Sequence, residues 1–200
     1  MNDKFFDLKK EKQDRMINAA LKIFALNGYN HASTDDIVKE AGISKGLLFH
    51  YFINKIGLYS FIFDYSVRYI SLEMTSTVDK ADNDYFGLYT QIMASYTNVM
   101  KSYPYMVAFV NSVQDENVVE ALKEISDKKN AVKAKVREYI DYANTSYVHS
   151  GTDISRLDDI IAYTSEAVLK KSLATNDQRP ELFYDEMKKY LLTLKQASYR

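Results

Sequence analysis

The chain has no cysteine, and its 200 residues include only two prolines and six glycines. Without cysteine there is no disulfide framework, no thiolate nucleophile and no cysteine-built zinc or iron–sulfur site. So few prolines and glycines leave few breaks in the chain, which favours long helices over many short strands joined by turns. Because 46% of the residues are hydrophobic, a sizeable core is possible. The sequence therefore predicts a soluble, globular, all-α protein.

Long apolar runs are also missing. No stretch approaches the ~18 uninterrupted apolar residues that a membrane-spanning helix needs, and the N-terminus lacks the apolar segment of a signal peptide. We therefore expect a cytoplasmic protein with no membrane partner. The net charge is −1, and residues 1–56 carry nine Lys and Arg against seven Asp and Glu. That mild asymmetry is by itself a weak indication of a nucleic-acid partner.

The sequence shows no recognisable catalytic motif. Its histidines, His31, His50 and His149, lie far apart, and none has the spacing of a helical metal site. Phosphate-binding glycine loops and a nucleophile elbow are absent. The paired acids at 35–36 and 158–159 are neighbours on a helix and so do not face each other. We predict no catalytic residue, no metal site and no cofactor.

Apolar residues at helical spacing predict about nine helices. Asn27-Gly28 is expected to end the first helix, and Pro104 to open the sixth. The last two helices form an antiparallel pair, and the pattern alone leaves open whether they complete a core or form a dimer interface. The expected helices span residues 9–26, 35–41, a third beginning after Ser44, 54–78, 85–102, 104–113, 117–147, 153–174 and 180–197.

Residues 33–53 have the layout of a helix-turn-helix. Ser33 and the residues after it suit a helix start, Gly42 suits a helix end, and Ser44 is placed to cap the next helix. Apolar positions that can meet between the two helices are Ile37, Ala41, Ile43, Leu48 and Phe52. A helical corner that only fills space would show the same pattern.

The outer face of the third helix argues against that simpler interpretation. An ordinary solvated face would carry Glu, Lys and Gln, but here several residues are apolar or aromatic. Amides at a helix N-terminus suit phosphates, Gly46 permits close approach to a groove wall, and Leu47 can pack on a thymine methyl. Lys55 adds a charge at the start of the next helix. The outer face is expected to present Ser44, Lys45, Gly46, Leu47, Phe49, His50 and Tyr51.

The segments "AALKIFALNGYNHAST" and "STDDIVKEAGISKGLLFHYFINKIGLY" resemble the N-terminal domain of the TetR family of bacterial transcriptional repressors. The resemblance covers about residues 10–60 and implies an all-helical homodimer. Residues 1–56 would bind DNA, and residues 57–200 would bind a ligand and dimerise through the last two helices. Two positions differ from the family: Phe49 replaces a common tyrosine, and Ile56-Gly57 replaces a usual acidic residue.

The resemblance also implies individual roles. Thr34 and Lys55 would contact phosphates, and residues Ser44 to Leu47 would enter the major groove. His50 and Tyr51 would contact the backbone or bases, whereas Phe49 would only pack.

We therefore expect a repressor that a small-molecule effector releases from a palindromic double-stranded operator. Seventeen tyrosines and seven methionines favour an effector that is apolar, aromatic or cationic. The alternatives are an all-helical protein-interaction module without DNA binding and, less favoured, a helical enzyme. The effector, the operator, the regulated genes and the choice between repression and activation are not predicted. Candidate effector-binding residues, on inward helix faces, are Tyr69, Met93, Tyr96 and Phe109.

Overall fold

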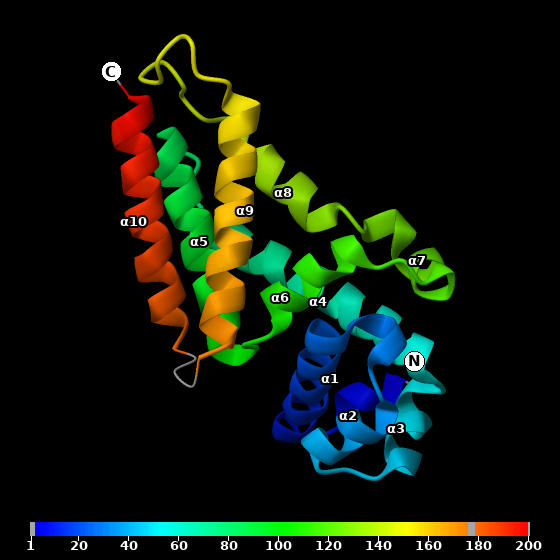
Figure 1. The fold of residues 1–200 in the computed structure, drawn as a ribbon. Helices are drawn as coiled ribbons and strands as arrows, with labels where there is room; N and C mark the ends of the chain where they lie inside the picture. Colours follow the sequence, from blue (N-terminus) through cyan, green and yellow to red (C-terminus); the bar gives the residue numbers. More distant parts are fainter. Residues whose placement is uncertain (1–2, 176–178, 200) are drawn as a thin grey trace. The chain divides into compact units, whose positions relative to one another are not determined.

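The computed structural model describes residues 3–175 and 179–199, and within them the fold is built from α-helices (Figure 1). Extended structure there is limited to two isolated bridges, Asp84 with Asn144 and Val148 with Tyr199. The predicted all-α class is confirmed. The elements are η1 (Asp3–Asp7), α1 (Lys10–His31), α2 (Thr34–Ala41), α3 (Lys45–Phe52), α4 (Lys55–Thr77), α5 (Tyr85–Ser102), α6 (Met106–Ser112), η2 (Val113–Asp115), α7 (Val119–Ile125), η3 (Ser126–Lys128), α8 (Ala131–Ile140), α9 (Ile154–Leu173) and α10 (Pro180–Ser198).

The chain forms two compact units, which are described separately. The first contains Met1–Tyr69 and Tyr103–Ala131, and the second contains Ile70–Ser102 and Val132–Arg200. Helix α4 therefore contributes to both. The functional boundary expected at residue 56 is a different kind of division, and it stays a prediction.

Aromatic side chains dominate the core of the first unit. Phe24 of α1, Tyr59 of α4 and Phe109 of α6 are fully buried, and their ring centroids lie 5.0–6.1 Å apart. Such edge-on and tilted ring contacts stabilise beyond simple burial. A polar cluster lies beside them: Tyr103 donates to Asp14 at 2.7 Å and shares a 2.8 Å hydrogen bond with Tyr65. Helices α1, α4 and α6 thus form one packed support for the helix-turn-helix.

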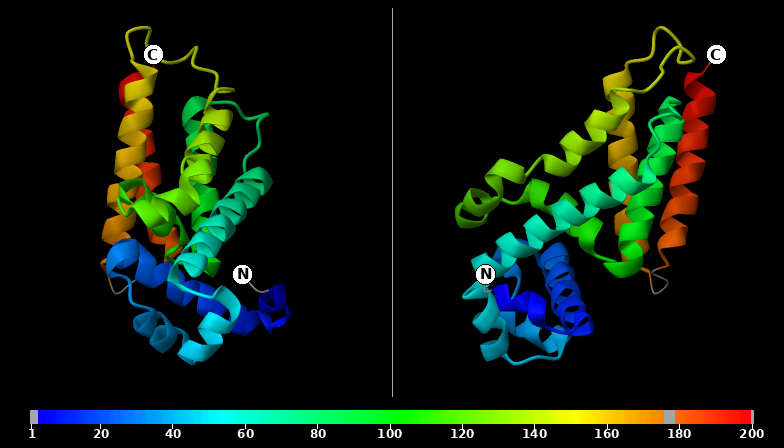
Figure 2. Two further views of the ribbon diagram at one scale, coloured as in Figure 1. Left: turned by 90° about the vertical axis from the view of Figure 1, so that its right-hand side faces the viewer. Right: turned by 180° about the vertical axis from the view of Figure 1, so that it is seen from behind.

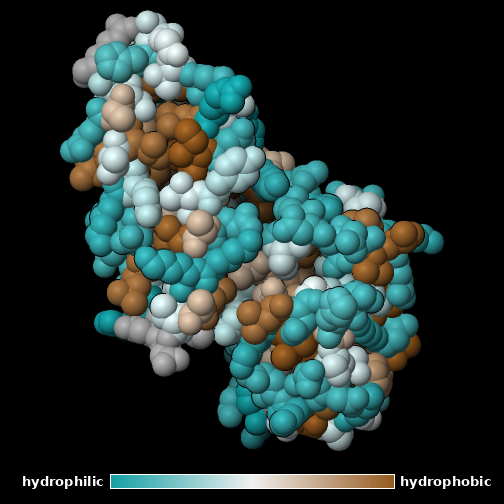
Figure 3. All heavy atoms as spheres, in the orientation of Figure 1, coloured by the Kyte–Doolittle hydropathy of each residue, from teal (hydrophilic) through white to brown (hydrophobic). Residues whose placement is uncertain are grey.

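The second unit is built around α5, α9 and α10, which lie side by side (Figures 1 and 2). Phe183, Met187 and Leu191 recur on α10 at helical spacing and are buried. Several large apolar side chains of α9 and α10 stay exposed, and apolar surface shows among the polar side chains there (Figure 3). These exposed residues are Ile160, Tyr163, Leu182, Tyr190 and Leu192.

A shared carboxylate ties three helices of the second unit together. Asp158 of α9 accepts from the hydroxyls of Tyr85 and Tyr89 on α5, at 2.6 and 2.8 Å. Its second oxygen accepts from Arg137 of α8 at 3.0 Å. Because buried polar groups are costly unless paired, this arrangement satisfies two buried tyrosines with one acid.

Two predicted helices differ from the structure. The first helix is expected to end near Leu26, but it continues to His31. Gly28, with φ +65°, interrupts it with a kink and does not end it. The predicted helix over 117–147 is wrong: it is divided into α7, η3 and α8, and an irregular segment follows Ile140. Gln114 donates to the carbonyl of Lys129 at 2.9 Å, where the chain turns between the two helices.

Candidate nucleic-acid interface

The turn between α2 and α3 follows from its capping residues. Ser33 Oγ accepts from the Asp35 amide at 3.1 Å, and Ser44 Oγ accepts from the Leu47 amide at 3.2 Å. Gly42 closes α2 with φ +62°, and the amides of Gly42 and Ile43 donate to the carbonyls of Lys39 and Val38. This is a Schellman motif, which needs the left-handed conformation that glycine adopts without strain. The predicted helix-turn-helix is confirmed.

Buried side chains fix α3 and leave its first turn open. Leu48 and Phe52 are buried, as are Ile37 and Ala41 of α2. A Cβ built on Gly46 would meet no atom within 4 Å, so a surface can approach its backbone closely. Leu47 and Phe49 are half-buried, and the exposed residues of the predicted outer face are Ser44, Lys45, Gly46 and His50.

Tyr51 does not lie on the outer face, which corrects the expectation from the sequence. It is only 7% exposed, because its ring packs edge-on against Phe5 with centroids 5.7 Å apart. Phe5 in η1 is fully buried and also contacts Phe52 and Phe61. This N-terminal segment was not predicted from the sequence. The aromatic pair at 5–6 within a charged stretch was the signal that could have revealed it.

Lys45 is held by a carboxylate of the neighbouring helix. Its Nζ donates to both carboxylate oxygens of Asp35, at 2.9 and 3.1 Å. Thr34 directly precedes Asp35 at the first position of α2, and it is half-buried. The first turns of α2 and α3 are therefore linked through two side chains that remain largely in solvent.

Lys55 is directed toward the end of α1. Its Nζ lies 4.5 Å from the ring centroid of Tyr29 and donates to the Asn30 carbonyl at 3.3 Å. Burial lowers the pKa of the Lys55 ammonium, and the nearby Glu120 and Glu116 oppose that shift. A phosphate contact by Lys55 would therefore replace contacts that the side chain already makes.

The joint between α3 and α4 is unusually tight. Ile53 has φ +65° and ψ −53°, and the Asn54 amide donates to the Phe52 carbonyl at 2.7 Å, which is a strained γ-turn. Asn54 then caps α4 by accepting from the Gly57 amide at 2.8 Å. A Cβ on Gly57 would lie 2.5 Å from the Phe52 carbonyl oxygen. Position 57 lies in one of the two places that differ from the family pattern, and close packing against the Phe52 carbonyl requires a glycine there.

The four candidate effector residues fall in both units. In the first unit, Tyr69 stacks on Tyr65 at 6.0 Å, and Phe109 is fully buried in the aromatic core. In the second, Met93 and Tyr96 lie about one turn apart on α5. Tyr96 is half-buried, its hydroxyl has no hydrogen-bond partner among the described residues, and burial alone raises its pKa. Tyr96 therefore offers a half-buried hydroxyl that is not hydrogen-bonded to another described residue.

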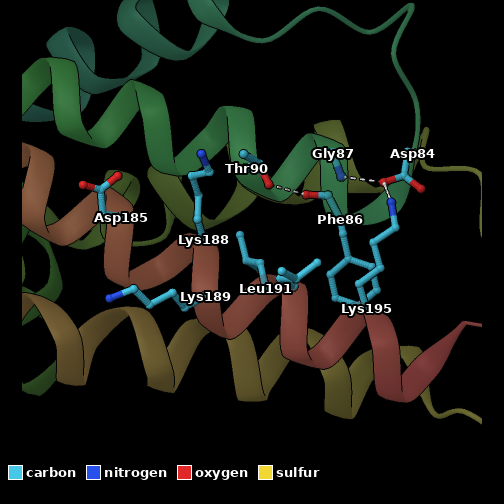
Figure 4. Close-up of a pocket in the computed structure, with 10 residues that line it drawn as sticks. Asp84, Phe86, Gly87, Thr90, Asp185, Lys188, Lys189, Leu191 and Lys195 are labelled. Carbon is cyan, nitrogen blue, oxygen red and sulfur yellow. Dashed lines mark hydrogen bonds and ion pairs between the residues drawn. The ribbon is translucent and has the colours of Figure 1, made fainter.

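A surface groove of about 590 Å³ runs along α5 and α10 (Figure 4). Its charged side chains are mostly paired: Lys195 contacts Asp84 at 3.1 Å, and Lys189 contacts Glu186 at 3.0 Å. Its lining includes none of the candidate effector residues. We assign no ligand to this groove.

Within residues 3–175 and 179–199, no group of three or more metal-ligating side chains comes together. In the same ranges, none of the helices combines the length and the apolar character needed to cross a bilayer.

An all-helical fold that presents a capped helix-turn-helix with an open, polar first turn belongs to the helix-turn-helix class. Residues 16–60 match the family described as bacterial regulatory proteins, tetR family. The HTH-type transcriptional regulator YuxN of Bacillus subtilis is 33% identical over 92 residues, which are 46% of this chain and 32% of that protein. The chain's match thus spans about a third of this relative's length.

Solved structures agree over nearly the whole chain. A TetR-family transcriptional regulator from Chloroflexus aurantiacus superposes with a TM-score of 0.61 at 18% identity, over 100% of this chain and 98% of that one. The transcriptional regulator FadR of Bacillus subtilis, in complex with stearoyl-CoA, gives a TM-score of 0.54 at 17% identity, over 90% and 97%. Residues 16–60 therefore resemble the tetR family, and the chain has the fold of these solved structures.

Proposed function

We propose that this protein is a cytoplasmic transcriptional regulator which, as a homodimer, represses from a palindromic operator and is released by a small-molecule effector. The observation that carries the proposal is the helix-turn-helix, in which Leu48 and Phe52 anchor α3 while Ser44, Lys45 and Gly46 stay exposed. Residues 1–56 would bind DNA, and residues 57–200 would dimerise and bind the effector.

DNA binding would use the N-termini of α2, α3 and α4. Free amides at a helix N-terminus favour phosphate, and Thr34 and Ser44 would add hydroxyl donors there. Gly46 would allow close approach to the groove, Leu47 would reach a thymine methyl, and His50 would donate to the backbone or a base edge. Phe49 would pack at the edge of the interface. The buried ring of Tyr51 would hold α3 in place, which limits any DNA contact to its hydroxyl.

Dimerisation would use the exposed apolar side chains of α9 and α10. Isologous packing of this helix pair against its copy would give a four-helix interface and bury residues such as Tyr163 and Leu192. The dimer would place its two α3 helices about 34 Å apart, one turn of B-DNA, so that each reads half of a palindrome.

The effector would be recognised partly through Tyr96. A half-buried hydroxyl without a partner among the described residues can donate to a ligand that offers a hydrogen-bond acceptor, and the methionine and aromatic residues nearby in the sequence favour an apolar remainder. Bacillus subtilis FadR was solved with stearoyl-CoA, which makes long-chain acyl thioesters the first compounds to test. Because coupling is reciprocal at equilibrium, effector and DNA would weaken each other's binding by the same factor.

An electrophoretic mobility shift with DNA from upstream of the protein's own gene tests the proposal. We expect retardation at low salt, a steep loss of affinity as salt rises, and release by stearoyl-CoA or a related thioester. If a folded dimer retards no duplex at low salt, the protein is an interaction module or an enzyme and the proposal fails. If DNA is retained but no acyl thioester releases it, only this effector class is excluded.

A further inference from the structure

Asp35 is a residue that the interface as described does not use. It lies in the first turn of α2, and both of its carboxylate oxygens accept from Lys45 Nζ, at 2.9 and 3.1 Å. Its side chain is 72% exposed and that of Lys45 is 49% exposed. An ion pair this exposed contributes little to folding, so its geometry calls for another explanation.

The position of the pair makes Asp35 costly for DNA binding. It joins the first turns of α2 and α3, the two helix ends at which phosphates are expected to lie. A carboxylate there suits the dipole of α2, but it repels a phosphate backbone. Lys45, at the first position of α3, is by contrast a cation at a helix N-terminus, which the dipole disfavours and which Asp35 offsets.

Asp35 also restricts what Lys45 can do. A lysine ammonium has three N–H donors, and a pair of contacts to one carboxylate uses two of them and fixes the direction of the third. A duplex that offers only phosphates must draw Lys45 away from Asp35, so one ionic contact is exchanged for another. A base acceptor at the right place can instead meet the remaining donor while the pair stays intact.

We propose that Asp35 is a specificity-determining positioning residue: by holding Lys45 it suppresses binding to DNA of arbitrary sequence and directs the lysine toward one acceptor of the operator. The inference rests on the proposed function. It acts through Lys45, so removing the carboxylate should strengthen phosphate-driven binding and weaken discrimination.

The test compares Asp35→Asn with Asp36→Asn by fluorescence anisotropy on two duplexes. One is the upstream fragment that the wild type retains, and the other is a shuffled duplex of the same length and composition. Asp36 is an exposed neighbour on α2 that forms no ion pair among the described residues, so the control removes the same charge without releasing Lys45. Each variant removes one acid from the first turn of α2, so each should lose at most about 1 kcal/mol of stability and remain folded.

For Asp35→Asn we expect tighter binding to the shuffled duplex and a salt slope steeper by about 0.9, the signature of one further phosphate contact. The ratio of operator to shuffled affinity should fall about fivefold or more, the size of one lost base discrimination. Asp36→Asn should raise both affinities alike and leave the ratio unchanged. In a Lys45→Ala background, Asp35→Asn should no longer change the ratio.

Equal behaviour of the two variants, or a change in the ratio that persists without Lys45, would overturn this inference and leave the proposed function standing. Failure of the wild type to bind either duplex would instead overturn the proposed function, and this inference with it.

Discussion

At the residue scale, Ile53 carries a local conformational cost. It is a β-branched residue at φ +65°, and it is 74% exposed, so little burial offsets the strain. Replacement by glycine, which adopts this conformation freely, should raise the free energy of unfolding by up to about 1 kcal/mol after the entropy of the unfolded chain is counted. Chemical denaturation monitored by circular dichroism measures the change.

Leu72→Gly is the matched control for this prediction. Leu72 is similarly exposed, at 70%, but lies inside α4, where glycine should destabilise by about 1 kcal/mol. Opposite signs for the two substitutions would support the strain at Ile53. A loss of stability in both would show that Ile53 is not strained in solution.

At the element scale, the joint between α3 and α4 depends on Gly57. A Cβ there would press on the Phe52 carbonyl oxygen, so Gly57→Ala should lower the free energy of unfolding by about 1–3 kcal/mol. Gly46→Ala meets open space and should instead stabilise by up to about 1 kcal/mol, because alanine is the better helix former. Thermal unfolding of the two variants, run side by side, distinguishes these outcomes.

The Gly46→Ala and Gly57→Ala variants also distinguish an effect on DNA binding from an effect on folding stability. Gly46→Ala should bind the retained duplex more weakly despite its greater stability, since its methyl group occupies the space where the backbone approaches the groove. Unchanged affinity would remove Gly46 from the interface. A Gly57→Ala variant as stable as the wild type would contradict the tight joint.

Local signals in the sequence predicted some of these elements and missed others. Ser33, Gly42 and Ser44 act within a few residues, so the helix-turn-helix could be predicted from capping chemistry alone. The segment after Ile140 could not, because its backbone pairs with distant residues: Asn144 donates to the Asn83 carbonyl, and His149 to that of Ser198. Periodicity carries no information about such pairing.

The candidate site shows the same limit. Helix periodicity places Gly46 away from the buried Leu48 and Phe52, so its exposure could be predicted. Lys45 is on the same side of α3 as those two residues, and it is exposed at the first position of the helix. The burial of Tyr51 depends on Phe5, more than forty residues earlier in the chain, and the Lys45–Asp35 pair depends on how two helices cross. Contacts between elements therefore needed the three-dimensional structure.

At the scale of the whole molecule, many of the 17 tyrosines should resist ionisation. Seven of the described tyrosines have a raised pKa, and burial is the largest cause in each. The pKa of Tyr29, for example, is raised to about 12. A raised pKa keeps the folded state protonated where the unfolded chain ionises, so these groups add stability below pH 10 that is lost as pH rises toward 12 and above. The seven are Tyr29, Tyr59, Tyr85, Tyr89, Tyr96, Tyr103 and Tyr199.

Alkaline titration of phenolate absorbance, with circular dichroism recorded in parallel, checks this prediction. The seven tyrosines with a raised pKa should ionise only as helicity is lost. Reversible ionisation of all the tyrosines together, with helicity retained, would contradict the packing of both units.

Selection from a library of random duplexes tests whether a dimer reads DNA through α3. We expect enrichment of an inverted repeat whose half-sites lie about one helical turn apart, bound by two chains. Enrichment of no sequence, or of a single unrepeated half-site bound by one chain, would contradict it.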